Sequence, residues 1–109
     1  TQIEDRLNEE LYQYCVNGPR ARNRIQINSG SCLTEEGHHF FRFNSFIDHL
    51  GSSWKIPEER IAQKLKDKCG VEFNHSLNVD GKTIKVCRVK QLHIDKIEYK
   101  PVERKESNY

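Results

Sequence analysis

The sequence predicts an α+β domain in which helices alternate with a short strand and a two-stranded hairpin completes the fold. Apolar residues recur at helical spacing over residues 2–16 and 57–69. Apolar and polar residues instead alternate on both sides of Asp80 and Gly81, a dipeptide that favours a tight hairpin turn. The length of 109 residues is enough for one domain of this kind and no more.

Composition excludes one class of protein and argues against another. No apolar run approaches the roughly 20 residues of a membrane-spanning helix, so a transmembrane protein is excluded and no membrane partner is expected. The N-terminal residues are acidic and polar, which argues against a secretory signal. The chain contains no methionine, so we interpret it as part of a longer protein. Because four cysteines occur without a secretory signal, we expect an intracellular protein of the cytoplasm or nucleus.

A helix is predicted over residues 2–16, because one apolar stripe recurs at every fourth position: Ile3, Leu7, Leu11 and Cys15. Gly18 and Pro19 end this helix, since glycine adopts the left-handed cap and proline cannot continue the helix. Such a stripe faces either the core of its own domain or another subunit.

The segment that follows is basic. Residues 15–31 contain three bases and no acid, a charge of +3. The bases are Arg20, Arg22 and Arg24. Three alternating arginines without a neighbouring acid favour binding to an anionic partner. Ile25 and Ile27 alternate with polar residues, which predicts a short strand.

The middle of the chain predicts a strand and two helices. The strand covers residues 38–43, and Asn44 or Ser45 then caps a short helix. The second helix begins at Pro57 and ends before Gly70, two residue types that suit these positions. Its apolar stripe, with the surrounding aromatic side chains, predicts one core: Ile61, Leu65, Cys69, Phe40, Phe41, Phe43, Phe46, Trp54 and Phe73.

The hairpin consists of strands over residues 71–79 and 82–92. Alternation in the first strand predicts that one face carries Val71, Phe73, His75, Leu77 and Val79. In the second strand it predicts Ile84 and Val86 on one face and Cys87 and Val89 on the other. The hairpin region, residues 71–92, has four bases and two acids, so it is also basic.

The segments HHFFRF, NSFIDHLGSSWKIPEERIAQKLKDKCG and VEFNHSLNVDGKTIKVCRVKQL thus run strand, helix, turn, helix, hairpin over residues 38–92. This order resembles a winged helix-turn-helix, and the resemblance covers about half of the chain. It implies an α+β winged domain over residues 32–100, an additional N-terminal helix and basic loop over residues 1–31, and a flexible tail over residues 101–109.

A narrower resemblance is carried by the phenylalanine-rich strand, the W-x-x-P sequence at residues 54–57 and the basic hairpin. These features resemble accessory winged domains of helicase–primase replication proteins of phages, plasmids and viruses. The chain contains no G-x-x-x-x-G-K-[ST] motif, so the motor of such a protein is not in this sequence. The resemblance implies a non-catalytic module of a larger replication or regulatory protein.

The winged-helix resemblance implies binding to duplex DNA. Residues 57–69 become the recognition helix, whose outward face is expected to enter the major groove with Arg60, Gln63 and Lys64. The hairpin becomes a wing that contacts phosphates through Lys82, Lys85 and Arg88. A second anchor is provided by Arg20, Arg22 and Arg24. Phosphate contacts of this number predict a marked salt dependence of binding.

The alternative is a winged helix that binds a protein instead of DNA, because fold does not fix function. Glu59 and Asp67 lie on the same helix face as the bases, which weakens attraction to a polyanion. The partner or second subunit would then contact the N-terminal helix, and Leu7 and Leu11 would be the sensitive positions.

The four cysteines and the histidines do not predict a metal site or a catalytic site. Cys69 and His75 are six positions apart, as are Cys87 and His93, a spacing unlike that of common structural zinc sites. His38 and His39 point to opposite faces of a strand and cannot act together on one substrate. We therefore expect buried free thiols, no cofactor and no enzyme activity.

Overall fold

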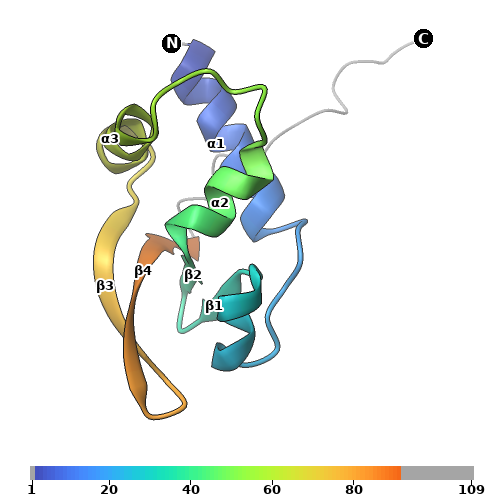
Figure 1. The fold of residues 1–109 in the computed structure, drawn as a ribbon, viewed down its shortest axis with the longest axis vertical. Helices are drawn as coiled ribbons and strands as arrows, with labels where there is room; N and C mark the ends of the chain where they lie inside the picture. Colours follow the sequence, from blue (N-terminus) through green and yellow to red (C-terminus); the bar gives the residue numbers. More distant parts are fainter. Residues whose placement is uncertain (1, 92–109) are drawn as a thin grey trace, which may run out of the picture.

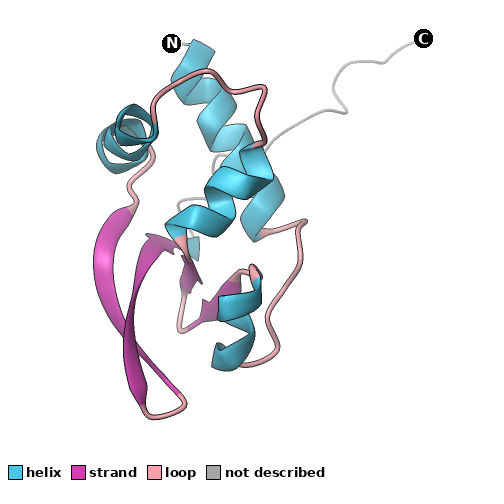
Figure 2. Cartoon of the chain, in the orientation of Figure 1, coloured by secondary structure: helices cyan, strands magenta, loops and turns pink. Residues whose placement is uncertain are grey.

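The computed structural model describes residues 2–91, which form an α+β domain (Figures 1 and 2). Its elements in chain order are α1 (Gln2–Cys15), the 3-10 helix η1 (Arg24–Ser29), β1 (Leu33–Glu35), β2 (His38–Phe41), α2 (Phe43–Leu50), α3 (Glu58–Lys68), β3 (Glu72–Val79) and β4 (Lys82–Lys90). None of the helices in this described part combines the length and apolar character that crossing a bilayer requires. The tail predicted over residues 101–109 lies outside the described residues.

The four strands form one antiparallel sheet in the order β1-β2-β4-β3. β4 is an inner strand of the sheet, because it pairs with β2 on one side and with β3 on the other. The three α-helices gather at one end of the molecule, and the turn between β3 and β4 lies at the opposite end (Figure 1). The hairpin therefore projects away from the helices.

A separate hydrophobic core lies against each face of the sheet. The first core joins the three α-helices to Phe41, Cys87 and Val89 of the sheet. The second core lies on the opposite face and joins η1 to Phe40 and Val86. The predicted facing of β4 is confirmed, since consecutive residues Val86 and Cys87 belong to different cores. The prediction that the aromatic residues share one core is wrong only for Phe40, which packs in the second core.

The N-terminal helix belongs to this domain. α1 contacts both α2 and α3, and Leu7, Leu11 and Cys15 are at most 2% exposed. The Tyr14 hydroxyl also donates a 2.5 Å hydrogen bond to the Gly30 carbonyl, which ties α1 to the end of η1. The apolar stripe therefore packs in the chain's own core, and only Ile3 at its beginning is exposed.

The strand predicted at Ile25 and Ile27 is wrong, because this segment forms η1. The Asn23 side chain accepts a hydrogen bond from the Gln26 backbone N–H, and Gly30 ends the helix with a positive φ of 99°. Both interactions are local and satisfy helix termini, which alternating apolar residues do not reveal. Ile27 is buried in the second core, whereas Ile25 is 54% exposed.

The strand predicted over residues 38–43 is two residues shorter and has a partner that the sequence did not predict. β2 pairs with β1, and Glu36 and Gly37 form the turn between them with positive φ angles. α2 begins already at Phe43, and Arg42 precedes it without a capping side chain, so the predicted caps are wrong. Phe43 is therefore the first residue of α2. The centroids of the Phe43 and Phe73 rings are 5.5 Å apart at the edge of the first core.

A β-bulge overturns the single apolar face predicted for β3. The register shifts between Glu72 and His75, where Asn74 adopts a left-handed φ of 61°. One extra residue reverses the alternation of faces. Val71 and Phe73 accordingly pack in the first core, whereas Leu77 and Val79 pack in the second.

Replacing Asn74 tests this bulge. Asn74→Val is expected to lower the free energy of unfolding by about 1–2 kcal/mol, because a β-branched residue tolerates a left-handed backbone poorly. Asn74→Gly is the matched control and should equal or exceed the wild-type stability. Urea denaturation followed by circular dichroism measures both, and equal stability of the valine and wild-type chains would contradict the bulge.

Replacing Leu11 tests the position of α1. Leu11→Ala is expected to cost about 2–5 kcal/mol of unfolding free energy, since it removes a fully buried side chain from the core. Ile25→Ala removes a similar side chain from an exposed position and should change stability by less than about 1 kcal/mol. Similar denaturation midpoints for the two variants would show that α1 does not pack on the domain in solution.

Candidate nucleic-acid interface

The outer part of the hairpin presents exposed polar and basic side chains. Lys82 follows the turn, in which Asp80 and Gly81 both have positive φ angles, as the sequence predicted. Lys85 is paired with Ser76 across the strands and donates a 2.8 Å hydrogen bond from Nζ to Ser76 Oγ. Both lysines are exposed, so they are available to a phosphate backbone.

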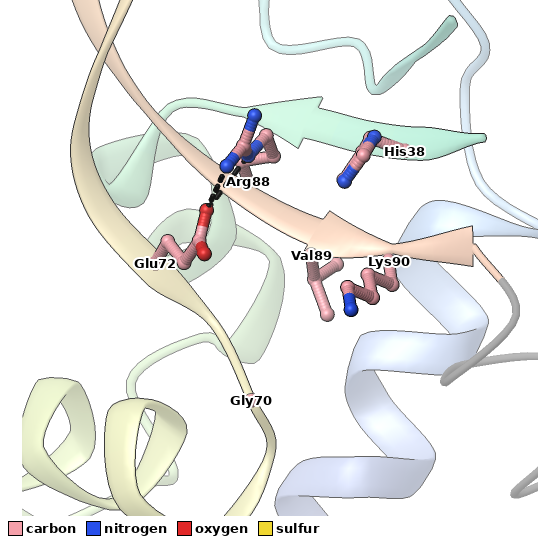
Figure 3. Close-up of a pocket in the computed structure, with 6 residues that line it drawn as sticks. All are labelled: His38, Gly70, Glu72, Arg88, Val89 and Lys90. Carbon is pink, nitrogen blue, oxygen red and sulfur yellow. Dashed lines mark hydrogen bonds and ion pairs between the residues drawn. The ribbon is translucent and has the colours of Figure 1, made fainter. Parts of the chain in front are cut away.

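Arg88, the third predicted wing residue, is held within the sheet. Its guanidinium forms an ion pair with Glu72, with Nε 2.7 Å and Nη2 2.5 Å from the same carboxylate oxygen (Figure 3). This contact lowers the pKa of Glu72. The two residues are Cα partners directly beside the bulge, so the ion pair ties β3 to β4 where the register shifts. They also line a shallow pocket of about 300 Å³ together with His38, Gly70, Val89 and Lys90.

Arg24 has a similar internal partner. Its Nε and Nη2 atoms lie 3.2 and 2.8 Å from the two carboxylate oxygens of Glu35, a bidentate contact. Its Nη1 atom donates a 2.9 Å hydrogen bond to the carbonyl of Asn78. One guanidinium therefore connects η1 to β1 and β3, and the hydrogen bonds to it lower the pKa of Glu35.

The other two arginines of the basic segment are more open. Arg20 is exposed, and its Nη2 atom donates a 3.3 Å hydrogen bond to the carbonyl of Val16. The Arg22 side chain is also exposed, while its backbone N–H donates to Gln26 Oε1 at 2.7 Å. Of the three predicted arginines, Arg24 therefore connects elements of the fold, whereas Arg20 and Arg22 remain accessible to a ligand.

The predicted recognition residues lie on α3. Arg60 and Gln63 are exposed, whereas Lys64 is partly buried. The buried residues of the same helix are Ile61 and Leu65. Gln63 Nε2 donates a 2.6 Å hydrogen bond to Asp67 Oδ2, so its amide is engaged within the helix. α3 is distant from the turn of the hairpin (Figure 1). The structure therefore keeps the α3 residues and Lys82 in separate regions.

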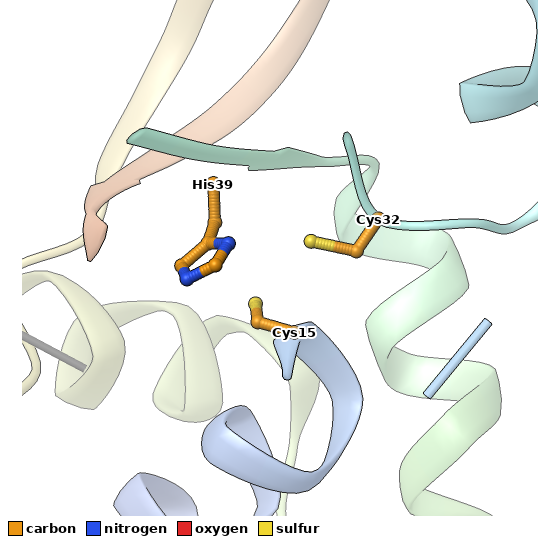
Figure 4. Close-up of side chains that lie close together, drawn as sticks. All are labelled: Cys15, Cys32 and His39. Carbon is orange, nitrogen blue, oxygen red and sulfur yellow. The ribbon is translucent and has the colours of Figure 1, made fainter. Parts of the chain in front are cut away.

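A buried cluster that the sequence did not predict lies in the first core. It contains Cys15, Cys32 and His39, separated by 17 and 7 positions in the sequence (Figure 4). A hydrogen bond from Cys15 lowers the pKa of Cys32, with smaller contributions from His39 and Arg20. Burial raises the pKa of Cys15. No local motif marks these residues; the apolar position of Cys15 in the α1 stripe is the nearest signal.

Comparison of the chain with protein-family models, with curated proteins and with solved structures finds no match in any of the three. What the chain does is therefore inferred from its own topology, exposed charges and buried groups.

The ion pairs of Glu35 and Glu72 predict a stability that falls in acid. Their arginine partners lower both pKa values from the ordinary 4.5. A lowered folded-state pKa contributes stability above the unfolded value, and this contribution is lost as the pH falls through the folded value. Thermal unfolding of the wild type should therefore show a midpoint that declines as the pH falls below the ordinary carboxyl pKa of 4.5.

The matched control is the double variant Glu35→Gln and Glu72→Gln. It removes both titrating carboxylates, so its midpoint is expected to be lower at neutral pH and to decline less steeply in acid. Parallel pH curves for the two proteins would contradict a stabilising role of these ion pairs.

Proposed function

We propose that this chain is a winged helix-turn-helix module that binds duplex DNA. The observation that carries the proposal is the pairing of β2 with β4, which brings the first strand into the sheet of the hairpin. With α2 and α3 between β2 and β3, the order is strand, two helices and hairpin in one sheet. This order of elements supports the proposal, in which α1 is the additional helix.

The hairpin acts as the wing in this proposal. It projects beyond the helices and carries Lys82 and Lys85 as exposed cations. Lysines at these positions bind phosphates and release condensed counterions, which gives affinity without sequence specificity. Arg88 supports the wing from within, because its charge is paired with Glu72.

α3 enters the major groove in this proposal. Arg60 is positioned to contact base edges or phosphates, and Gln63 does so after releasing Asp67. Lys64 contributes beside them at the partly buried edge of this face. Arg20 and Arg22 form the second anchor to the DNA backbone, whereas Arg24 maintains the framework through Glu35.

The proposed role is that of a non-catalytic module in a larger replication or regulatory protein. The net charge of +2 predicts modest affinity for the isolated chain, so the parent protein would supply further contacts. All four cysteines are free and buried, which suits a reducing intracellular compartment such as the cytoplasm or nucleus.

A protein partner is the second candidate. The Gln63–Asp67 hydrogen bond and the acidic first turn of α3 give this face a mixed charge that suits a protein better than a polyanion. Leu7 and Leu11 are fully buried, so this partner would contact another surface than the apolar stripe of α1.

Fluorescence anisotropy with labelled DNA tests the proposed function. We expect duplex DNA to bind the 109-residue chain, with an affinity that falls tenfold or more between about 50 and 200 mM salt, because added salt opposes the counterion release that accompanies at least two phosphate contacts. Single-stranded and forked DNA serve as comparison ligands. Absence of binding at low salt with tens of micromolar protein would reject DNA as the main partner of this chain.

The double variant Lys82→Ala and Lys85→Ala tests the wing directly. Two missing phosphate contacts should reduce the slope of log affinity against log salt by about 2. Lys90→Ala is the control, since Lys90 is also exposed but lies at the other end of β4. A control effect of half the size, that is an equal effect for each lysine removed, would show that the wing lysines act only as general surface charge.

A further inference from the structure

The cluster in the first core brings three ligand-type side chains to one point. Cys15 ends α1, Cys32 directly precedes β1, and His39 lies in β2. Each is at most 2% exposed. Their two Sγ atoms and a ring nitrogen of His39 all lie within 4.8 Å of one another (Figure 4). Three elements distant in sequence therefore converge on one buried volume.

His39 carries the second observation. Its Nδ1 atom is 2.8 Å from Thr34 Oγ1, whereas its buried Nε2 atom has no hydrogen-bond partner among the described residues. A buried polar atom without a partner is costly and calls for an explanation. In Figure 4 the ring nitrogen nearer to Cys32 is the one beside the carbon that bears Cβ, so a turn of the imidazole ring must accompany metal binding through Nε2. Metal-binding histidines are commonly oriented by a hydrogen bond from their other ring nitrogen.

We propose that Cys15, Cys32 and His39 bind one Zn²⁺ ion in the core, with Thr34 as the residue that positions the imidazole. Thiolate and imidazole are the preferred ligands of this ion. Zn–S and Zn–N distances of about 2.3 and 2.1 Å in a tetrahedral site place the ligand atoms about 3.6 to 3.8 Å apart. Side-chain rotations, including a turn of the imidazole ring, would bring these groups, now within 4.8 Å of one another, to this spacing.

Charge also suits this site. Binding releases one proton from each thiol, and two thiolates balance the two charges of the ion, so the buried complex is neutral. The described residues supply three ligands, and a water molecule completes the tetrahedron. Because Cys15 belongs to α1 and the other two ligands to the β1–β2 region, the ion would join the N-terminal helix to the sheet.

The spacing that argued against zinc in the sequence concerned other residues. Local zinc motifs place ligands two to five positions apart in one loop. Here the separations are 17 and 7 positions, and strand pairing and helix packing bring the residues together. Such a site leaves no pattern in the sequence.

Cobalt titration of the reduced, metal-free chain tests the proposal. Co²⁺ is expected to give a thiolate-to-metal charge-transfer band and the intense visible bands of a tetrahedral ion, saturating at one ion per chain. Zn²⁺ should displace it. Absence of these bands at micromolar metal, or formation of only a Cys15–Cys32 disulfide, would overturn the proposal.

Variants separate a specific site from general thiol binding. Cys32→Ala and His39→Ala are each expected to weaken Zn²⁺ binding by more than tenfold, and Thr34→Val by roughly tenfold through the lost orientation of His39. Cys69→Ala is the matched control, because Cys69 is also fully buried but lies outside the cluster. Equal loss in the control would overturn the assignment.

X-ray absorption of the zinc-loaded wild type keeps the test independent of how well the variants fold. Two sulfur neighbours and at least one nitrogen neighbour in the first shell are expected. A shell of oxygen and nitrogen alone would place the ion elsewhere and reject the site.

Discussion

β4 is the element on which the rest of the structure depends. It pairs with β2 and with β3, and its consecutive residues Val86 and Cys87 face opposite cores. Fully burying an apolar side chain contributes about 1.5–3 kcal/mol, so a strand buried on both faces contributes to both cores. The helices cover one face and η1 covers the other, which leaves the far end of the hairpin free to project.

The arginines illustrate how a basic composition divides into framework and surface. Arg24 and Arg88 each contact a carboxylate, 11 and 16 residues away in sequence. Exposed ion pairs contribute little to folding stability on average. These two, however, connect neighbouring strands and η1. Their charge is offset within the molecule, so in the proposed DNA complex attraction would depend on the remaining bases of the hairpin, the basic segment and α3.

The first core combines structural packing with a group of unusual chemistry. Cys15, Cys32 and His39 lie among the same side chains that hold α1 against the sheet. Any ion or oxidation event at this cluster would therefore act on the attachment of α1, and through it on α2 and α3. α3, the helix proposed to contact DNA, therefore shares one hydrophobic core with the buried cluster. No pattern in the sequence links the two.

The sequence by itself determined the elements whose signals are local. The four-residue stripe of α1, the glycine after α3 and the turn at Asp80 and Gly81 each depend on neighbours within one turn of chain, and the structure has all three. The predicted start of α3 is wrong by one residue, because Pro57 is the N-cap and the helix begins at Glu58. The facing of β4 followed from strict alternation for the same reason.

Only the tertiary structure decided the remaining features. The bulge at Asn74 reversed the faces of β3 because two cores, and not one, had to be filled. The partners of Arg24 and Arg88 arose from strand pairing, and the cluster around His39 arose from packing α1 on the sheet. These are contacts between residues distant in sequence, and periodicity carries no information about which distant residues will meet.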